Sequence, residues 1–190
     1  MRPLAPIVPR AGDTMPETRM IVIVEGADLV GKSTLAASLA HLHSWPIVKI
    51  RWALLGDPEI ETRAMATSTI AILEATRPSV IFDRSYFSWW AYGPALGHPV
   101  AYMPEVIRAY QPVEETRLVI LTASADALAQ RYERQPDLHF SLEVIQAAND
   151  RFRRLADILP LSLHHLQLDT SRINADSVLF AVERFLAVPR

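Results

Sequence analysis

The sequence predicts an α/β fold with a five-stranded parallel sheet in a single domain. Short runs rich in Val, Ile and Leu alternate with longer stretches in which apolar residues return at helical spacing. Strands that are nearly continuous in apolar residues and separated by helices are typical of a parallel sheet covered on both faces. The chain has 190 residues, of which 50% are hydrophobic, so one domain with a substantial core is expected.

Five short segments are expected to form the strands of this sheet. They are residues 20–25, 46–51, 79–83, 117–122 and 164–169. Four of the five are rich in Val, Ile and Leu, as strands buried on both faces are. At least one stretch with helical spacing follows each strand along the chain, as a parallel sheet requires of its connections.

Six stretches are expected to form helices, because their apolar residues recur every three or four positions. They are residues 32–43, 58–76, 101–110, 124–134, 141–159 and 174–187. The clearest pattern lies in 141–159, where one stripe holds Ile145, Ala148, Phe152, Leu155 and Leu159. This stripe is expected to face the sheet.

The first 19 residues are expected to be a flexible extension, which leaves 20–188 as the folded domain. The extension contains four prolines and no apolar periodicity. The prolines also interrupt the apolar core that a signal peptide needs, and no apolar run approaches the ~20 residues that cross a bilayer. We therefore expect a cytoplasmic protein without a membrane partner, in a bacterial or phage-infected host cell.

Charge and composition exclude several kinds of site. The net charge of −2 gives no global basic field for nucleic acid or an anionic membrane. The chain has no cysteine, which excludes disulfides, thiolate metal sites and cysteine nucleophiles. Its histidines show no spacing with carboxylates that would predict a metal site.

The stretch GADLVGKS, residues 26–33, fits the pattern G-x-x-x-x-G-K-[ST] between a predicted strand and a predicted helix. Its two glycines allow successive backbone N–H groups to point inward around an anion at the positive end of a helix. The lysine would neutralise the β- and γ-phosphates of ATP, and the serine hydroxyl would bind Mg²⁺. The residues expected to hold the nucleotide are Gly26, Ala27, Asp28, Leu29, Val30, Gly31, Lys32, Ser33 and Thr34.

A second motif follows the third predicted strand, which ends in Asp83 and Arg84. A carboxylate at this strand end, beside the phosphate loop, is expected to hold Mg²⁺ together with Ser33. The adjacent guanidinium is expected to clamp an anionic or hydroxyl-bearing acceptor.

The two motifs together resemble those of the thymidylate kinases and the related deoxynucleoside kinases. EGADLVGKST is similar to the family's Glu-Gly-x-Asp-x-x-Gly-Lys-Ser-Thr, and DRSYFSWWAY is similar to Asp-Arg-Tyr-x-x-Ser-x-x-Ala-Tyr. Ser85 replaces the expected Tyr or His, which makes the segment closer to the Glu-Arg-Ser of deoxynucleoside kinases. The resemblance implies a P-loop NTPase three-layer sandwich with strand order 2-3-1-4-5 and a site at the carboxyl ends of the strands.

The resemblance also implies a mobile lid at residues 128–135, with Arg131 and Arg134 on one helical face. Lid arginines stabilise charge on the transferring group and exclude water. A solvated amphipathic helix is the alternative. The catalytic residues expected on these grounds are Lys32, Asp28, Asp83, Arg84, Arg131 and Arg134.

On the acceptor side, the resemblance places Asp28 near a hydroxyl of the acceptor sugar, as a base or only as an orienting group. Capping of the following helix is the structural alternative for this aspartate. Arg51, Ser88 and Tyr92 are expected to contact the acceptor, and Arg63 is a further candidate. The expected reaction moves the γ-phosphoryl of Mg-ATP to a nucleoside, a nucleotide or another nucleobase-bearing acceptor.

Two alternatives remain open at this stage. Six aromatic residues suit either stacking on a base or packing in the core; they are Trp52, Tyr86, Phe87, Trp89, Trp90 and Tyr92. The segment between the phosphate loop and Asp83 is shorter than in the thymidylate kinases, which suggests a more open acceptor pocket. A hydroxymethyl-pyrimidine such as 5-hydroxymethyluracil within DNA is then a candidate acceptor. In that case Arg151, Arg153 and Arg154 would contact the phosphate backbone of the DNA; otherwise they form the solvated face of a helix. The second alternative is a P-loop ATPase that is not a kinase. A homodimer is also left open.

Overall fold

The computed structural model describes residues 19–49, 79–98, 116–160 and 163–188. The predicted helices 58–76 and 101–110, the candidate acceptor residues Arg51 and Arg63, and nearly all of the predicted extension lie outside these ranges. Within them, no helix has the length and apolar character that a membrane span requires.

Five parallel strands form one sheet in the order β2-β3-β1-β4-β5. The strands are β1 (Ile21–Gly26), β2 (Ile47–Lys49), β3 (Val80–Asp83), β4 (Thr116–Thr122) and β5 (His165–Asp169). Strand number, direction and order are those predicted. β1, β3 and β4 are buried along their whole length, which explains why their sequences are so apolar.

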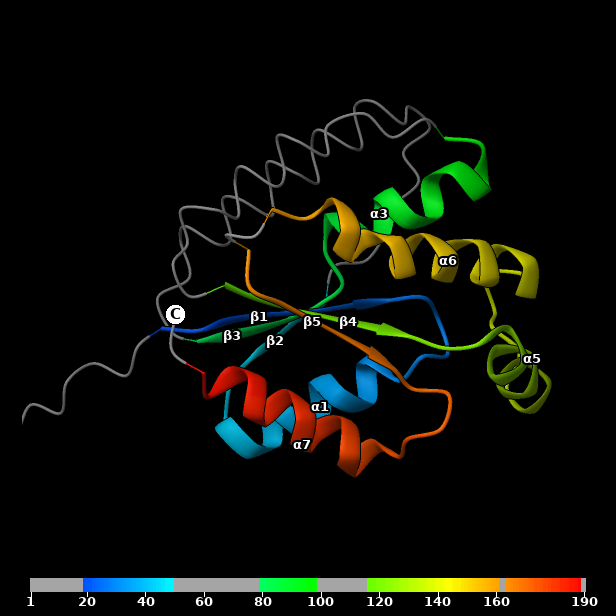
Figure 1. Cartoon of the computed structure of the whole chain (residues 1–190). Helices are drawn as coiled ribbons and strands as arrows, with labels where there is room; N and C mark the ends of the chain where they lie inside the picture. Colours follow the sequence, from blue (N-terminus) through cyan, green and yellow to red (C-terminus); the bar gives the residue numbers. More distant parts are fainter. Residues whose placement is uncertain (1–18, 50–78, 99–115, 161–162, 189–190) are drawn as a thin grey trace, which may run out of the picture.

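Helices cover both faces of the sheet, so the domain has three layers (Figure 1). α1 (Lys32–His43) and α7 (Ala175–Leu186) lie on one face, and α3 (Tyr86–Tyr92) and α6 (Leu142–Ile158) lie on the other. α5 (Ala125–Arg134) stands beyond the carboxyl end of β4. This arrangement confirms the predicted α/β sandwich.

α3 and the 3₁₀ turn η1 (Gly93–Leu96) are absent from the helices expected from spacing. α3 is seven residues long, and all of its residues except Trp90 are buried. A short helix buried nearly all round has no polar face, so its apolar residues show no helical period.

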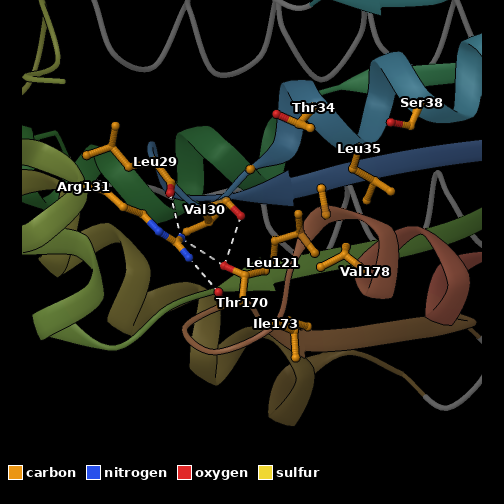
Figure 2. A pocket seen from close by; sticks show the side chains of 12 residues that line it. Leu29, Val30, Thr34, Leu35, Ser38, Leu121, Arg131, Thr170, Ile173 and Val178 are labelled. Carbon is orange, nitrogen blue, oxygen red and sulfur yellow. Dashed lines mark hydrogen bonds between the residues drawn. The ribbon is translucent and has the colours of Figure 1, made fainter. Parts of the chain in front are cut away.

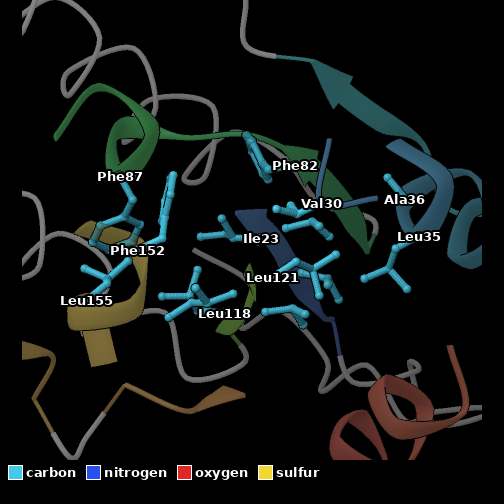
Figure 3. Packing of buried hydrophobic residues seen from close by; sticks show 14 of the residues in the cluster. Ile23, Val30, Leu35, Ala36, Phe82, Phe87, Leu118, Leu121, Phe152 and Leu155 are labelled. Atoms are coloured by element: carbon cyan, nitrogen blue, oxygen red, sulfur yellow. The ribbon is translucent and has the colours of Figure 1, made fainter. Parts of the chain in front are cut away.

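The core lies between the sheet and its two helical layers (Figure 3). On one side, Phe87 of α3 packs near Phe152 and Leu155 of α6. On the other side, Leu35 and Ala36 of α1 face the sheet. The predicted stripe of α6 is buried, from Ile145 to Leu159.

The parallel arrangement brings four chain segments to one edge of the sheet. Val24 of β1 is paired with Asp83, and Gly26 is paired with Leu121. The segments that leave β1, β3, β4 and β5 therefore begin side by side. They are the phosphate loop, the turn at Arg84, the start of α5 and the turn after Asp169.

Candidate active site

The phosphate loop leaves β1 through Gly26, whose φ of 143° is unfavourable for any residue with a side chain. A Cβ at Gly26 would lie 2.2 Å from the carbonyl oxygen of Leu121, so β4 also excludes a side chain. Gly31, with φ 97°, ends the loop and precedes α1. The first N–H groups of α1 follow the loop directly and have no partner within the helix, so they suit an anion.

Lys32 is buried at the first position of α1. Its Nζ donates to the carbonyl oxygen of Ala27 and lies 3.7 Å from Oδ1 of Asp28. Burial, together with the positive charge of Arg84, lowers the pKa of Lys32 to about 8. The Lys32 ammonium is therefore held by residues of the same loop that is expected to bind the phosphates.

Ser33 and Asp83 meet beside the loop. The Ser33 hydroxyl donates to Oδ2 of Asp83 over 3.0 Å. Nζ of Lys49, at the end of β2, lies 3.3 Å from the same oxygen. A hydroxyl and a carboxylate are the oxygen ligands that Mg²⁺ prefers, so this pair fits the metal. The described residues contain no group of three or more His, Asp or Glu arranged to bind a metal.

Asp28 joins the phosphate loop to the turn after β3. Its carboxylate forms an ion pair with the Arg84 guanidinium and accepts from the Tyr92 hydroxyl over 2.7 Å. The same hydroxyl accepts from the backbone N–H of Asp28, also over 2.7 Å. No side chain caps α1, so the alternative of a capping role for Asp28 is not observed.

The charge of Asp28 is fixed by this network. Burial acts to raise its pKa, but the charges of Lys32 and Arg84 and the Tyr92 hydrogen bond outweigh burial, so the pKa lies below its usual value. A carboxylate with a lowered pKa is a weak proton acceptor. The geometry therefore favours the orienting role over the role of a base.

Arg84 adopts an unusual backbone conformation for a residue with a side chain, with φ 78°. Its backbone N–H donates to the carbonyl oxygen of Val24, and one guanidinium nitrogen donates to Oγ of Ser88 over 3.3 Å. The guanidinium also lies 5.7 Å from the centre of the Tyr92 ring. Burial acts to lower the pKa of Arg84, but the negative charges around it, with Asp28 first among them, together raise the pKa.

Arg131 of α5 lines a pocket beside the phosphate loop (Figure 2). Its guanidinium donates to the carbonyl oxygen of Leu29 over 2.8 Å and to the Thr170 carbonyl oxygen over 2.6 Å. The Thr170 hydroxyl donates to the Val30 carbonyl oxygen over 3.1 Å. Arg131 thus holds the middle of the phosphate loop to the turn that follows β5.

The pocket has a volume of about 190 Å³ and lies between α1, α5 and α7. Its walls are mainly apolar, with Leu35, Ile173 and Val178 among them, and hydroxyls come from Thr34, Ser38 and Thr170. An apolar cleft with a few polar groups, next to a phosphate loop, suits the base of a nucleotide.

The other predicted site residues differ in how far they are exposed to solvent near the phosphate loop. Arg134 is exposed on α5. Ser88 and Tyr92 are fully buried, and they contact Arg84 and Asp28, respectively. Tyr86, Phe87 and Trp89 are also buried, which favours core packing over base stacking for these three aromatics.

The basic cluster on α6 makes separate contacts within the protein. Arg151 donates to the Trp90 carbonyl oxygen and lies 4.2 Å from the Trp90 ring centre. Arg153 donates to the Ala123 carbonyl oxygen and pairs with Asp169. Arg154 donates to a backbone carbonyl of its own helix. This pattern is that of a helix face with local partners.

Three residues at this edge were not predicted as site residues. They are Glu25, Lys49 and Thr170. Glu25 was visible as the first residue of the EGADLVGKST motif but was given no role there, and Lys49 was visible only as one of two lysines in the chain. The only sequence feature that pointed to Thr170 was its position directly after the last expected strand, 164–169.

Solved structures with the same fold include proteins that bind or phosphorylate small molecules. The YorR protein from Bacillus subtilis, in complex with phosphorylated GDP, has a TM-score of 0.66 and 21% identity, over 90% of this chain and 100% of that chain. Deoxyadenosine kinase from M. mycoides, with dCMP and a flexible dCDP, has a TM-score of 0.60 and 14% identity, over 88% and 98%. A gluconokinase from Sinorhizobium meliloti 1021 has a TM-score of 0.57 and 13% identity, over 90% and 93%.

At these identities the similarity shows the fold, which is the P-loop kinase fold expected from the motifs. No protein-family model matches the chain, and no curated protein sequence is significantly similar to it.

Proposed function

We propose that the protein is an ATP-dependent phosphotransferase that moves the γ-phosphoryl of Mg-ATP to a deoxynucleoside or deoxynucleotide acceptor. The observation that carries the proposal is the pairing of the phosphate loop with the segment after β3 at two points. Ser33 contacts Asp83 there, and Asp28 contacts Arg84. At the end of the loop, one pair would bind the metal and the neighbouring charged pair would meet the acceptor.

On the donor side, the base of ATP would enter the pocket beside Arg131, and its phosphates would lie along the N–H groups from Gly26 to Ser33. Lys32 would release the Ala27 carbonyl and neutralise the terminal phosphates. Ser33 and Asp83 would hold Mg²⁺, which supplies charge neutralisation of the triphosphate.

In the proposed transfer, an oxygen of the acceptor bonds to the γ-phosphorus while the bond from that phosphorus to the bridging oxygen of ADP breaks. A nucleoside hydroxyl passes its proton to water in the same reaction, whereas a monophosphate attacks through a phosphate oxygen that has no proton to lose. Such transfers are loose, so positioning contributes more than proton removal. Asp28 therefore orients the acceptor, and Arg84 balances charge beside it. Arg131 and Arg134 remain the proposed lid cations, and Arg131 would have to leave Leu29 to reach the γ-phosphate.

Two of the solved structures support a nucleotide-type acceptor. YorR holds phosphorylated GDP, and the deoxyadenosine kinase holds dCMP and dCDP. The gluconokinase has the same fold, so a sugar acid is a necessary comparison in any screen. Neither the DNA-base acceptor nor a motor-type ATPase gains support from a contact in the described residues, since Arg151 and Arg153 have partners within the domain.

The test is a screen with γ-labelled ATP against dTMP, thymidine, other nucleosides and their monophosphates, gluconate, and DNA with or without hydroxymethyl-pyrimidines. We expect label on a nucleoside or a nucleoside monophosphate, with one ADP formed per labelled product. Lys32→Ala is the control and should abolish labelling. Label on gluconate alone, or ADP without a labelled product, would refute the proposed function.

A further inference from the structure

Glu25 is a buried carboxylate that the proposed transfer does not use. It is 0% exposed and lies on β1 immediately before the phosphate loop. Its Oε1 accepts from the backbone N–H and the hydroxyl of Ser85, each over 2.6 Å, and from the Ser88 N–H over 3.2 Å. Its Oε2 accepts from the Ser88 hydroxyl over 2.6 Å. A buried carboxylate with this many donors is a strong constraint on the turn that supplies them.

The contacts of Glu25 continue to Arg84 through one hydroxyl. Oγ of Ser88 donates to Glu25 and accepts from the Arg84 guanidinium over 3.3 Å. The other terminal nitrogen of the guanidinium pairs with Asp28. One terminal nitrogen of the Arg84 guanidinium is therefore held directly by the Asp28 carboxylate, and the other is held by the Glu25 carboxylate through Ser88.

The turn that carries Arg84 needs such support. Its left-handed backbone conformation, with φ 78°, is unfavourable for a residue with a side chain. Such conformations persist where surrounding contacts fix them, and they are common at functional sites. Glu25 fixes the residues that follow Arg84, because it accepts from the N–H of Ser85, directly after Arg84, and from the N–H of Ser88 in the first turn of α3.

We propose that Glu25, acting through Ser88, is a positioning residue that holds the Arg84 guanidinium in the orientation required for phosphoryl transfer. The inference rests on the proposed function, and it adds a residue to which that function assigns no role. Glu25 does not touch the substrate, because it is buried behind Ser85 and Ser88. Burial raises its pKa, against the opposing effect of the two serine hydrogen bonds, which is consistent with a group that water does not reach.

The two serines provide a matched pair of variants. Both hydroxyls are fully buried and both donate to Glu25 over 2.6 Å. Only the Ser88 hydroxyl also contacts Arg84, whereas the Ser85 hydroxyl accepts from the Phe87 N–H at the start of α3. Ser88→Ala and Ser85→Ala therefore remove similar atoms from similar surroundings, but only Ser88→Ala breaks the path from Glu25 to Arg84.

The first measurement does not depend on activity. Nitrogen-15 NMR of the full chain should show restricted rotation of the Arg84 guanidinium, with Arg84→Lys used to assign its signals. We expect Ser88→Ala and Glu25→Gln to release this rotation and Ser85→Ala to leave it restricted. Glu25→Gln keeps the size of the side chain but replaces one accepting oxygen with an NH₂ group. Rotation that is unchanged in Ser88→Ala would overturn the inference.

The second measurement is steady-state kinetics with the acceptor found in the screen. Ser88→Ala should lower kcat about tenfold, with little change in the KM for ATP, whereas Ser85→Ala should stay within about threefold of the wild type. In an Arg84→Ala background, Ser88→Ala should have no further effect, because the group that it positions is gone. Equal losses in the two serine variants, or additive effects of Ser88→Ala and Arg84→Ala, would indicate a merely structural role.

The two failures can be told apart. A wild-type protein that labels no acceptor refutes the proposed function, while the NMR comparison still tests whether Glu25 and Ser88 hold Arg84. An active wild type with equal serine variants refutes the inference alone.

Discussion

The Asp28 carboxylate and the Arg84 guanidinium form an ion pair that links two loops 56 residues apart in the sequence. One loop follows β1 and the other follows β3, and the parallel pairing of these strands places the two loops together. The pair is reinforced by Tyr92, whose hydroxyl contacts both the carboxylate and the backbone of Asp28. The acceptor is therefore expected to meet two charges whose positions are already set.

Asp28→Asn tests whether this carboxylate orients the acceptor or takes its proton. The variant keeps the shape but loses the charge that pairs with Arg84, so kcat should fall by about tenfold or more. Because the pKa of Asp28 lies below its usual value, wild-type kcat should be constant from about pH 5.5 to about pH 7.5. A wild-type kcat that rises tenfold per pH unit in this range, with the rise lost in Asp28→Asn, would identify a base instead.

The lowered pKa of Lys32 predicts that raising the pH above 8 weakens ATP binding but increases the free energy of unfolding. Its pKa is lowered to about 8 from 10.5, so above pH 8 the free protein loses a positive charge that the triphosphate needs. The Kd of a fluorescent ATP analogue should then rise by up to about tenfold per pH unit above pH 8.

In the same pH range, the unfolded chain keeps the lysine proton that the folded chain releases. The contribution of Lys32 to the free energy of unfolding should therefore increase from pH 8 toward 10.5. Lys32→Ala is the control for both measurements and should remove the two slopes. A Kd that does not change between pH 7 and 9.5 would show that Lys32 is not the group that pairs with the phosphates.

Gly26→Ala should destabilise the fold because of both φ and a close contact. The new Cβ would lie 2.2 Å from the Leu121 carbonyl oxygen, and we expect a loss of about 3 kcal/mol or more in the free energy of unfolding. Gly97→Ala is the matched control, since Gly97 also has positive φ, of 80°, but no atom of the described residues lies within 4 Å of the added Cβ. That variant should lose about 1 kcal/mol in urea unfolding. Equal losses would mean that β4 does not constrain the loop.

Arg131→Ala should weaken ATP binding as well as turnover. The guanidinium supports the Leu29 carbonyl and forms part of the wall of the base pocket, so we expect the Kd for ATP to rise about tenfold. Thr170→Val keeps the shape but removes the hydroxyl that contacts Arg131 and Val30, and should give a smaller rise in Kd. Arg134→Ala should lower kcat with little change in Kd, since Arg134 does not line the pocket. An unchanged Kd in Arg131→Ala would support a role in transfer alone.

The parts of the fold that were predicted are those set by local pattern. The helix expected at 32–43 has the same bounds as α1, and the other helices and strands in the described ranges differ by about a residue or two at their ends. The sheet order was expected from the resemblance to the P-loop kinases, and the observed pairing of β1 with β3 agrees with it. α3 was missed because a buried aromatic helix has no polar face from which to recognise it.

The site was predictable where one short segment carries the chemistry. Gly26, Lys32 and Ser33 lie in a single motif, and their roles depend on a loop that the motif itself builds. Glu25 was not assigned a role, because its importance comes from two serines 60 and 63 residues further along the chain. The contacts of the Arg131 side chain could not be predicted from the local sequence either, because its partners Leu29 and Thr170 are 102 and 39 residues away.

Lys49 offers a chemical probe of this edge of the sheet. The chain has two lysines, and while Lys32 is buried, the Lys49 side chain is 56% exposed. An amine-specific reagent should therefore modify Lys49 in preference to Lys32, next to the carboxylate oxygen shared with Ser33. The rate of acylation at this one amine, followed by peptide mass spectrometry, would report the arrival of a divalent cation at Asp83 without any assay of turnover.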